Sequence, residues 1–360
     1  MIYRLVRLNI FLQHIYIPVK NNNGVQETYT RRVQKTGRST FIISLPKEWV
    51  EKTSLKKLDT VKIVTLPFGL LVTTDGHEQG RESVIRLSGN ETPDEVVRLF
   101  FSKYLDGSDR IRVELSSYLP QAISVLKDRI RRWLVGVEII GETATELTAQ
   151  VLPVSDKLPL HTSLERMGEI TSHMLVEAMT AFSRNDKALA EDVVRRDDEV
   201  DRFYHFITRQ LNIAVRDYAK LRNINLSDPS DCISYVLVAK SIERAADHAV
   251  TISNITLSTT NNSKPDQRII KINAKVAELF DTSLASFLYP STELANKTLS
   301  QIAAISSEMN AYLNSQKKYL DLERRLTELV VINSVRRVAE YAADISEAAI
   351  NLATKDSFSK

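Results

Sequence analysis

The spacing of hydrophobic residues changes along the chain, and each spacing predicts a different secondary structure. In residues 29–75 apolar side chains recur at every second position, as in Phe41, Ile43 and Leu45. A period of two is typical of β-strands. Apolar runs at residues 61–63 and 70–74 predict two further strands, and PKEWVEKT, which precedes them, predicts one short helix. We therefore expect a small β domain in this region.

Residues 81–154 alternate between strand and helix patterns. The strand-like runs are SVIRL, RIRVEL, VGVEII and LTAQVLPV, and the helix-like runs are TPDEVVRLFFSKYL and PQAISVLKDRIRRWL. Thr92 followed by Pro93 is a typical helix start, because the threonine side chain caps the first turn and proline fits its first position. The order of the runs predicts a small βαβαββ domain.

From residue 159 onward apolar residues recur with a helical period, and Gly168 is the one internal glycine. Long amphipathic patterns of this kind predict helical hairpins packed as a bundle. The polar segment ITLSTTNNSKPDQ, residues 255–267, divides the region. The expected helices are 161–184, 187–220 and 230–256 before this break, and 268–287, 292–314 and 318–353 after it.

The two halves of the helical region repeat each other. Placing Glu243 on Glu340 also brings Asp247 onto Asp344, all at a spacing of 97 residues. The same alignment matches further pairs: Ala245 with Ala342, Ala246 with Ala343, and Asn254 with Asn351. A repeat of about a hundred residues is too long for an ordinary solenoid unit and fits a three-helix bundle. We expect two such bundles side by side.

Length and charge add a functional indication. A chain of 360 residues predicts several domains. Residues 1–66 contain twelve Lys/Arg and four Asp/Glu, a charge of +8, whereas the whole chain carries +3, so the remaining residues sum to −5. This asymmetry suggests an anionic partner for the N-terminal part, nucleic acid being the commonest. A merely solvated charged surface is the alternative.

The rest of the composition points to a soluble cytoplasmic protein. Cys232 is the one cysteine, so neither an intrachain disulfide nor a cysteine-based zinc site can form within one chain. Residues 1–20 are rich in apolar side chains, but Arg4, Arg7 and His14 interrupt them, and no cleavage site for a signal peptide follows. We interpret residues 1–28 as an extra strand or a loosely ordered extension, and no apolar run is long enough to insert in a membrane.

Pairs of acidic residues four positions apart mark the helical region. Glu243 and Asp247 form one pair, and side chains at this spacing lie about 40° apart on one helix face. The other pairs are Glu340 with Asp344 and Asp197 with Asp201. Carboxylates that converge from neighbouring helices can hold a metal ion, to which His248 could add a nitrogen ligand. The alternative is a solvated acidic helix face, since single pairs arise by chance. The signal for a site is the recurrence of the pair at matching places of the internal repeat.

One of these motifs resembles a known family. IERAADHAVTI, residues 242–252, is similar to the ERxxDHxxNI signature of the PhoU family of phosphate-signalling proteins. The family has two three-helix repeats whose E/D-x-x-x-D motifs bind iron or zinc clusters. The resemblance therefore implies metal ligands at Asp197, Asp201, Glu243, Asp247, Glu340 and Asp344. Thr251 replaces the family asparagine, and Ile302 and Ser306 stand where the second repeat would need acids.

The N-terminal region resembles a second family. RRVQKTGRSTFIISLPKEW followed by LKKLDTVKIV is similar to SpoVT/AbrB DNA-binding domains, whose swapped hairpins interlock in a dimer. About 45 residues can hardly bury a core alone, so a dimer is also the physical expectation. Leu58 stands where that family usually has glycine, which implies a looser or different turn.

The resemblance to SpoVT/AbrB domains implies roles for the basic hairpin. The residues assigned to DNA binding are Arg31, Arg32, Lys35, Gly37, Arg38, Ser39, Thr40 and Lys47. The cations would reach phosphates or guanine edges, Gly37 would permit the tight turn, and the two hydroxyls would contact phosphate. The alternative is a hairpin whose cations only keep a strand edge soluble.

The patterns and resemblances together predict a multidomain α+β chain. After the extension at 1–28, we expect an AbrB-like swapped-hairpin domain at 29–76, an α/β domain at 81–154, and PhoU-like three-helix repeats at 159–257 and 266–355. The combination resembles a type of archaeal phosphate uptake regulator.

We expect a homodimeric regulator that binds double-stranded DNA, and whose helices sense phosphate status through an iron, zinc or other divalent metal cluster or through a partner. An adaptor that contacts a phosphate transporter or its ATPase subunit without binding DNA is the main alternative. A metal-dependent phosphohydrolase is a third, disfavoured because the sequence shows no convincing nucleophile or P-loop.

Overall fold

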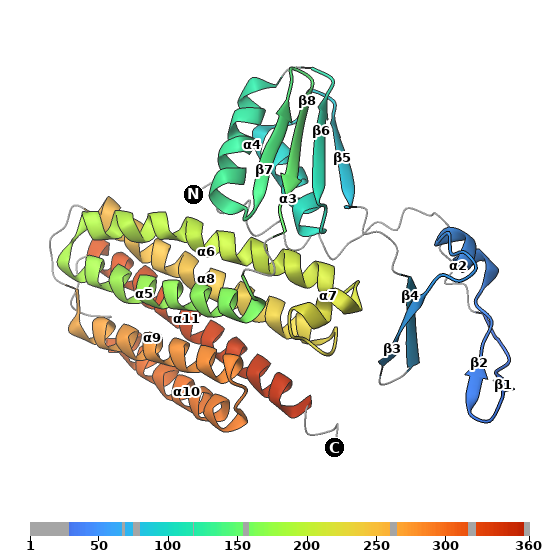
Figure 1. The fold of residues 1–360 in the computed structure, drawn as a ribbon. Helices are drawn as coiled ribbons and strands as arrows, with labels where there is room; N and C mark the ends of the chain where they lie inside the picture. The colour runs from blue at the N-terminus through green and yellow to red at the C-terminus, as the bar shows by residue number, and fades with distance from the viewer. Residues whose placement is uncertain are drawn as a thin grey trace. The chain divides into compact units, whose positions relative to one another are not determined.

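The structure is a computed structural model that describes residues 29–66, 69–74, 80–117, 119–153, 158–259, 265–315 and 322–355. The chain divides into two compact units, Met1–Gly80 and Arg81–Lys360. The first contains short strands and a helix, and the second contains an α/β domain and a helical region (Figure 1). The fold is therefore mixed α+β, as predicted, while the expected extension at residues 1–28 lies outside the described residues.

The described residues of the first unit form two antiparallel hairpins and one short helix. Its elements are β1 (Gln34–Thr36), β2 (Thr40–Ile42), α2 (Lys47–Lys52), β3 (Val61–Leu66) and β4 (Gly69–Thr74). The first hairpin is shorter than predicted, since Ile43 and Leu45 lie outside β2. In the described residues, strand β2 pairs only with β1. The chain then turns at Pro46, which has no N–H to donate and is the N-cap of α2.

The first unit has no core of its own among the side chains that the structure describes. None of those in residues 29–65 and 69–74 is buried, and Phe41, Ile63 and Leu70 are each at least 60% exposed. An isolated two-stranded hairpin is marginally stable in water. The apolar side chains of these two hairpins therefore need another surface to cover them.

Three of the described residues of this unit, Gly37, Ser54 and Leu58, have left-handed backbone conformations. Gly37 has φ +63° between β1 and β2, as expected for the tight turn. Leu58 has φ +77° with a 91% exposed side chain, in the turn before β3. A side chain with a Cβ is disfavoured at such φ values, so Leu58 strains this turn.

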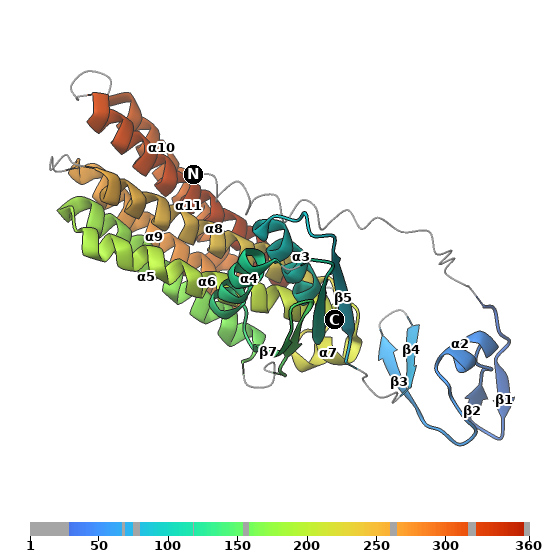
Figure 2. The ribbon, with the colours of Figure 1, turned by 90° about the horizontal axis from the view of Figure 1, so that it is seen from above.

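The α/β domain begins the second unit. Its elements follow the predicted order: β5 (Glu82–Leu87), α3 (Pro93–Leu105), β6 (Arg110–Leu115), α4 (Pro120–Trp133), β7 (Val137–Glu142) and β8 (Glu146–Val151). The sheet order is β5-β6-β8-β7, with β5 parallel to β6 and the other pairs antiparallel. Helices α3 and α4 lie beside the sheet (Figure 2). Buried residues alternate along β6 and β8, so one face of the sheet meets these helices.

The core of this domain explains why the sequence pattern was informative. Phe100, Tyr104 and Leu126 from the two helices pack with Ile111 and Leu147 from the sheet, and each is at most 1% exposed. Helix α3 starts as predicted. The Thr92 side chain accepts a hydrogen bond from the Glu95 backbone, and the Glu95 carboxylate accepts one from the Thr92 backbone, which forms a capping box.

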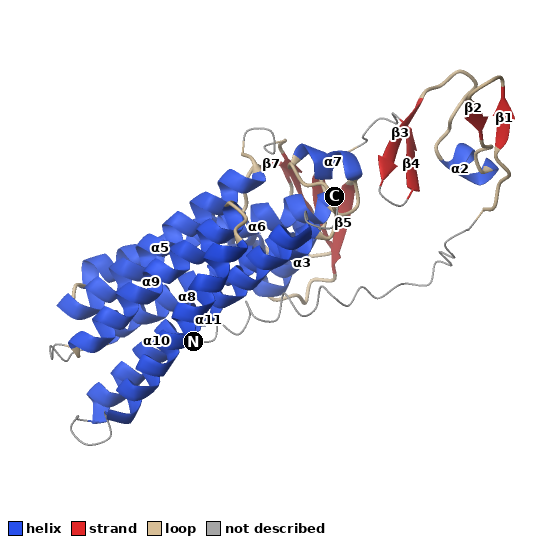
Figure 3. Ribbon diagram, turned by 90° about the horizontal axis from the view of Figure 1, so that it is seen from below, coloured by secondary structure: helices blue, strands red, loops and turns tan. Residues whose placement is uncertain are grey.

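The helical region forms two sets of three long helices that run side by side (Figure 3). The first set is α5 (Leu160–Arg184), α6 (Lys187–Ala214) and α8 (Asp231–Ser258); the second is α9 (Gln267–Leu288), α10 (Thr292–Ser315) and α11 (Leu322–Lys355). Their bounds lie close to the predicted ones. None of the helices in the described ranges has the length and apolar character needed to cross a membrane.

The second helix of the first set ends earlier than predicted. Helix α6 stops at Ala214, and a separate short helix, α7 (Tyr218–Asn223), follows. The Asp217 side chain accepts hydrogen bonds from the backbone N–H groups of Ala219 and Lys220. A new N-cap at this point starts a second helix instead of extending the first, which corrects the predicted single helix 187–220.

Gly168 marks the contact between the two helical sets. A Cβ at this position of α5 would lie 2.0 Å from Cδ2 of Leu284 on α9. The single internal glycine therefore lets α5 and α9 approach closely. Nearby, the Asn273 side-chain amide of α9 donates to the Leu175 carbonyl of α5 at 3.3 Å, so the two repeats are joined by both packing and a hydrogen bond.

Candidate functional site

The basic hairpin presents its polar side chains to solvent. Arg31, Arg32, Lys35 and Arg38 are all exposed. Lys35 lies opposite Phe41 in the antiparallel register, so both side chains are on the same face of the hairpin. The Arg31 guanidinium lies 5.4 Å from the centroid of the Tyr29 ring. The cations expected to contact DNA are thus accessible, and their role in binding DNA stays a prediction.

The other residues of the predicted DNA-binding set are also at the surface. Gly37 and Ser39 are exposed in the turn, and Thr40 begins β2. Lys47 lies in the first turn of α2, where its Nζ is 3.7 Å from a Glu51 carboxylate oxygen. A surface ion pair of this kind contributes little and leaves the ammonium accessible.

The acidic motif of the first repeat lies between α6 and α8, which pack against each other. Asp197 and Asp201 on α6 and Glu243 on α8 are almost fully buried, with at most 7% of each residue exposed, and Asp247 is half-buried. Burial of ionised carboxylates is unfavourable unless positive charge or hydrogen bonds compensate them. The groups around these acids, and not only their spacing, therefore decide how their charge is compensated.

A lysine that sequence reasoning missed lies at this motif. Lys240, one turn before Glu243, places its Nζ 2.7 Å from a Glu243 carboxylate oxygen, and the two side chains are 14% and 4% exposed. The same ammonium group is 4.8 Å from the centroid of the Tyr204 ring on α6. A buried cation thus meets the motif glutamate directly and lies against the neighbouring helix.

The pKa of the Tyr204 phenol reflects the negative charge around it. Burial raises the pKa of its phenol well above the usual range, and the charges of Glu243 and Asp201 raise that pKa further. The hydrogen bond with Thr208 and the positive charge of Arg244 act in the opposite direction. Tyr204 therefore stays a neutral phenol close to carboxylates from both helices.

The second repeat shows a related arrangement on α11. The Arg337 guanidinium is paired with Glu340 and also donates to the Tyr341 hydroxyl at 3.0 Å. Burial raises the pKa of Asp344, Glu347 adds to the increase, and Arg337 and Arg244 oppose it. Since Arg244 belongs to α8, the charged groups of the two repeats influence each other across the α8/α11 contact.

The predicted metal ligands do not gather into one set in the part of the chain that the structure describes, and their role as ligands stays a prediction. In the described ranges no three His, Cys, Asp or Glu side chains come together in a way that could hold a metal ion. In the second repeat, Ile302 is a buried apolar residue and Glu340 is paired with Arg337. The structure brings Asp201 and Glu243 near one phenol, but it places the Lys240 ammonium at the glutamate.

Helix α6 uses a different face to hold the α/β domain. The Trp133 indole N–H of α4 donates to an Asp198 carboxylate oxygen at 2.7 Å. The ring of Phe101 on α3 meets the edge of His205, with centroids 5.1 Å apart. These positions follow Asp197 and Tyr204 by one residue each, a rotation of 100° about the helix. Neighbouring faces of α6 thus serve the acidic motif and the α/β domain.

Arg209 is a buried polar residue of that interface. It is 6% exposed and donates to the carbonyls of Tyr104 at 2.5 Å and Ser108 at 2.9 Å. It also pairs with Asp109 at 3.1 Å, and its guanidinium lies 5.0 Å from the Tyr104 ring centroid. A Cβ on Gly107, which has φ +91°, would lie 2.7 Å from Ile213, so this turn fits closely against α6.

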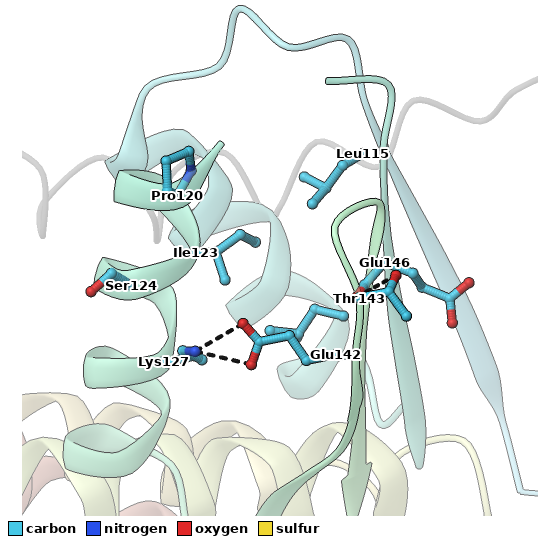
Figure 4. Close-up of a pocket in the computed structure, with 9 residues that line it drawn as sticks. Leu115, Pro120, Ile123, Ser124, Lys127, Glu142, Thr143 and Glu146 are labelled. Carbon is cyan, nitrogen blue, oxygen red and sulfur yellow. Dashed lines mark hydrogen bonds and ion pairs between the residues drawn. The ribbon is translucent and has the colours of Figure 1, made fainter. Parts of the chain in front are cut away.

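A small cavity lies between α4 and the sheet of the α/β domain (Figure 4). Its volume is about 90 Å³, and Leu115, Ile123 and Leu147 form the apolar part of its lining. The Lys127 ammonium donates to both Glu142 carboxylate oxygens at 2.9 Å beside it. Ligand pockets usually exceed roughly 300 Å³. The cavity therefore does not support a small-molecule site.

Two kinds of functional position escaped the sequence analysis. Lys240 could have been found, because a cation stands three residues before the glutamate in both repeats and Arg337 is its counterpart 97 residues later. Arg209 had no comparable signal. Its acceptors are mainly backbone carbonyls about a hundred residues earlier in the chain, and such acceptors leave no trace in the sequence.

Comparison with known proteins shows that the first helical repeat is similar to PhoU domains. Residues 164–256 match a family model described as "PhoU domain". This range spans most of α5, all of α6 and most of α8, and includes the acidic motif of the first repeat. The family likeness expected from the motif in residues 242–252 is thereby supported.

Individual relatives carry the same description. The chain is 24% identical over 207 residues to the "Phosphate-specific transport system accessory protein PhoU homolog" of Clostridium acetobutylicum, covering 56% of this chain and 93% of that protein. It is 29% identical over 148 residues to the protein of the same name from Caulobacter vibrioides, covering 40% and 59% of the two chains. It therefore spans nearly all of the first relative and about six tenths of the second.

A solved structure is also similar. The phosphate transport system regulatory protein PhoU from Streptococcus pneumoniae shares 21% identity and gives a TM-score of 0.48, covering 54% of this chain and 94% of that one. The similarity of residues 29–76 to SpoVT/AbrB domains stays a prediction.

Proposed function

We propose that this chain regulates phosphate transport by contact with a component of a phosphate transporter. The carrying observation is the match of residues 164–256 to the PhoU domain model, together with relatives described as accessory proteins of phosphate-specific transport systems. Regulation by protein contact requires neither a catalysed reaction nor the binding of DNA.

A binding measurement tests this proposal. The full chain would be immobilised and exposed to the purified ATPase subunit of its host's phosphate transporter, and phosphate uptake would be compared in cells with and without the gene. We expect saturable binding and altered uptake. Absence of both effects would overturn the proposal.

DNA binding by the basic hairpin is the second candidate function. It is favoured by the charge of +8 in residues 1–66 and by the exposure of Arg31, Arg32, Lys35 and Arg38. Affinity that comes from such cations falls steeply with salt, because phosphate contacts release counterions. A regulator of this type would control transport through transcription instead of through a protein contact.

Fluorescence anisotropy with promoter-length genomic fragments separates the two candidates. One variant replaces the four hairpin cations by alanine. A control variant removes the same charge from the rest of the unit by substituting Lys52, Lys56, Lys57 and Lys62. If the hairpin reads DNA, the first variant loses binding and regulation of uptake while the control keeps both. An adaptor keeps its regulation of uptake in both variants.

We further propose that a second copy of this chain completes the first unit. Its two hairpins have no buried side chain in residues 29–65 and 69–74, and Phe41 is 68% exposed. Burial of such apolar surface against a symmetric copy is the simplest source of a core. We expect a dimer in analytical ultracentrifugation, dissociated by Phe41→Glu but not by the control Val176→Glu on exposed surface of α5. A monomeric wild-type chain would contradict this.

A further inference from the structure

The two repeats share a feature that is distinct from their acidic pairs. Lys240 precedes Glu243 by three positions on α8, and Arg337 precedes Glu340 by three positions on α11. Both cation positions and both glutamate positions are separated by the 97 residues of the internal repeat. In each repeat the cation is ion-paired with that glutamate. The cation is therefore as much a part of the repeated motif as the acid.

An aromatic ring lies beside each cation, Tyr204 of the neighbouring helix α6 for Lys240 and Tyr341 of the same helix for Arg337. The Lys240 ammonium lies 4.8 Å from the Tyr204 ring centroid, and the Arg337 guanidinium lies 4.9 Å from that of Tyr341. Cations are attracted to the faces of such rings, and the attraction is stronger where water is excluded. Lys240 is the more enclosed of the two, with 14% of its side chain exposed, against 49% for Arg337.

A metal ion and the Lys240 ammonium would compete for the same carboxylate. The Lys240 ammonium already lies 2.7 Å from a carboxylate oxygen of Glu243, where it neutralises the charge of that group. A divalent ion at that oxygen would repel the ammonium at short range, in a region where few waters screen the charges. The geometry also brings no third carboxylate or imidazole into a metal-holding set within the described ranges.

We propose that Lys240 and Arg337 are resident counterions of the motif glutamates, and that they take the place of bound metal in the PhoU-like region of this chain. This inference goes beyond the proposed function and does not depend on it. At Glu243, which is 3% exposed, the positive charge that a buried acid requires comes from the polypeptide itself. The stability of the helical region should then be independent of metal supply.

Metal analysis of the intact chain tests the proposal directly. Protein purified from iron- and zinc-replete cells is expected to contain less than about a tenth of a metal ion per chain, and chelation should leave its melting temperature unchanged. One or more ions of iron or zinc per chain, lost in a Glu243→Gln variant, would overturn the proposal.

Substitution of the lysine supplies the second arm of the test. Lys240→Gln removes the counterion and leaves the Glu243 carboxylate buried without it, so the melting temperature should fall by roughly 6 °C or more, and added Zn²⁺ or Mn²⁺ should not restore it. Restoration by either metal would overturn the proposal. The control is Lys275→Gln on α9, whose ammonium pairs with Glu308 at 2.7 Å but is half exposed. Equal behaviour of the two variants would refute the role of Lys240. If Lys240→Gln does not fold, Lys240→Arg is expected to restore a metal-free, stable protein, and failure of this rescue would also refute the role.

Discussion

Replacement of Arg209 by methionine should detach the α/β domain from helix α6. Methionine keeps an unbranched apolar stem but removes every hydrogen bond that the guanidinium makes. The carbonyls of Tyr104 and Ser108 would then lose a buried donor. Loss of the donor to the Ser108 carbonyl costs roughly 1–3 kcal/mol. The Tyr104 carbonyl keeps its hydrogen bond from the Gly107 backbone N–H, so there the loss is that of one hydrogen bond, roughly 0.5–1.5 kcal/mol. The pair with Asp109, whose side chain is 44% exposed, adds little.

The expected loss is about 3 kcal/mol in the free energy of unfolding of the second unit, taking about 2 kcal/mol for the Ser108 carbonyl and about 1 kcal/mol for the Tyr104 carbonyl. For a domain of this size, about 3 kcal/mol lowers the melting temperature by roughly 6–12 °C. Thermal unfolding followed by circular dichroism measures this change. Hydrogen exchange should also become faster in residues 104–109, where the acceptors lie.

A matched control separates this effect from the general loss of a charge. Arg195→Met alters the same helix at a side chain that is 67% exposed and paired with Asp192 three residues away. Its expected cost is below roughly 0.5 kcal/mol, as for other surface ion pairs. Melting temperatures of the two variants within about 2 °C of each other would refute the argument that Arg209 holds the interface.

Three further predictions follow from single positions. Leu58→Gly should stabilise the first unit by about 1 kcal/mol, because Leu58 has φ +77° and is 91% exposed; slower hydrogen exchange in β3 and β4 would show this, and unchanged exchange would contradict it. Thr92→Ala removes the α3 capping box and should cost about 1 kcal/mol in urea unfolding; an unshifted midpoint would argue against the cap. Burial raises the pKa of Asp281, so the folded state binds its proton more tightly than the unfolded chain, whose aspartates have a pKa of about 3.9. The contribution of Asp281 to wild-type stability should therefore fall as pH rises above the unfolded pKa. The urea midpoint of Asp281→Asn should exceed that of the wild type by more at pH 7 than at pH 4.5, and an equal difference at both pH values would contradict this.

The sequence was most informative where local rules act without competition. Strand and helix patterns with strong caps, such as the one at Thr92, predicted the order of the α/β domain. The helices of the PhoU-like region were found because long apolar periods leave few alternatives. Asp217 shows the limit of such patterns. Its side chain caps a new helix in a stretch whose apolar period continues, so periodicity alone merged α6 and α7.

The candidate site was predicted only in part, because spacing identifies acids but not what neutralises them. The pairs at Asp197 and Glu243 came from the repeat, yet the contact of Lys240 depends on how α6 and α8 pack. In the first unit the sequence placed Gly37 in a left-handed turn correctly. It overestimated the length of β2, because a strand extends only as far as a partner pairs with it.

Helix α6 has a mechanical consequence that follows from its two neighbouring faces. Turning it by one residue would carry Asp198 and Arg209 out of the α/β interface, and would also move Asp201 and Tyr204 away from α8. Rotation about its axis is therefore opposed from both sides at once, and sliding along its axis meets the same opposition. A movement of α5 or α8 that reaches α6 must then pass to the α/β domain as a tilt of α6 as one rigid rod.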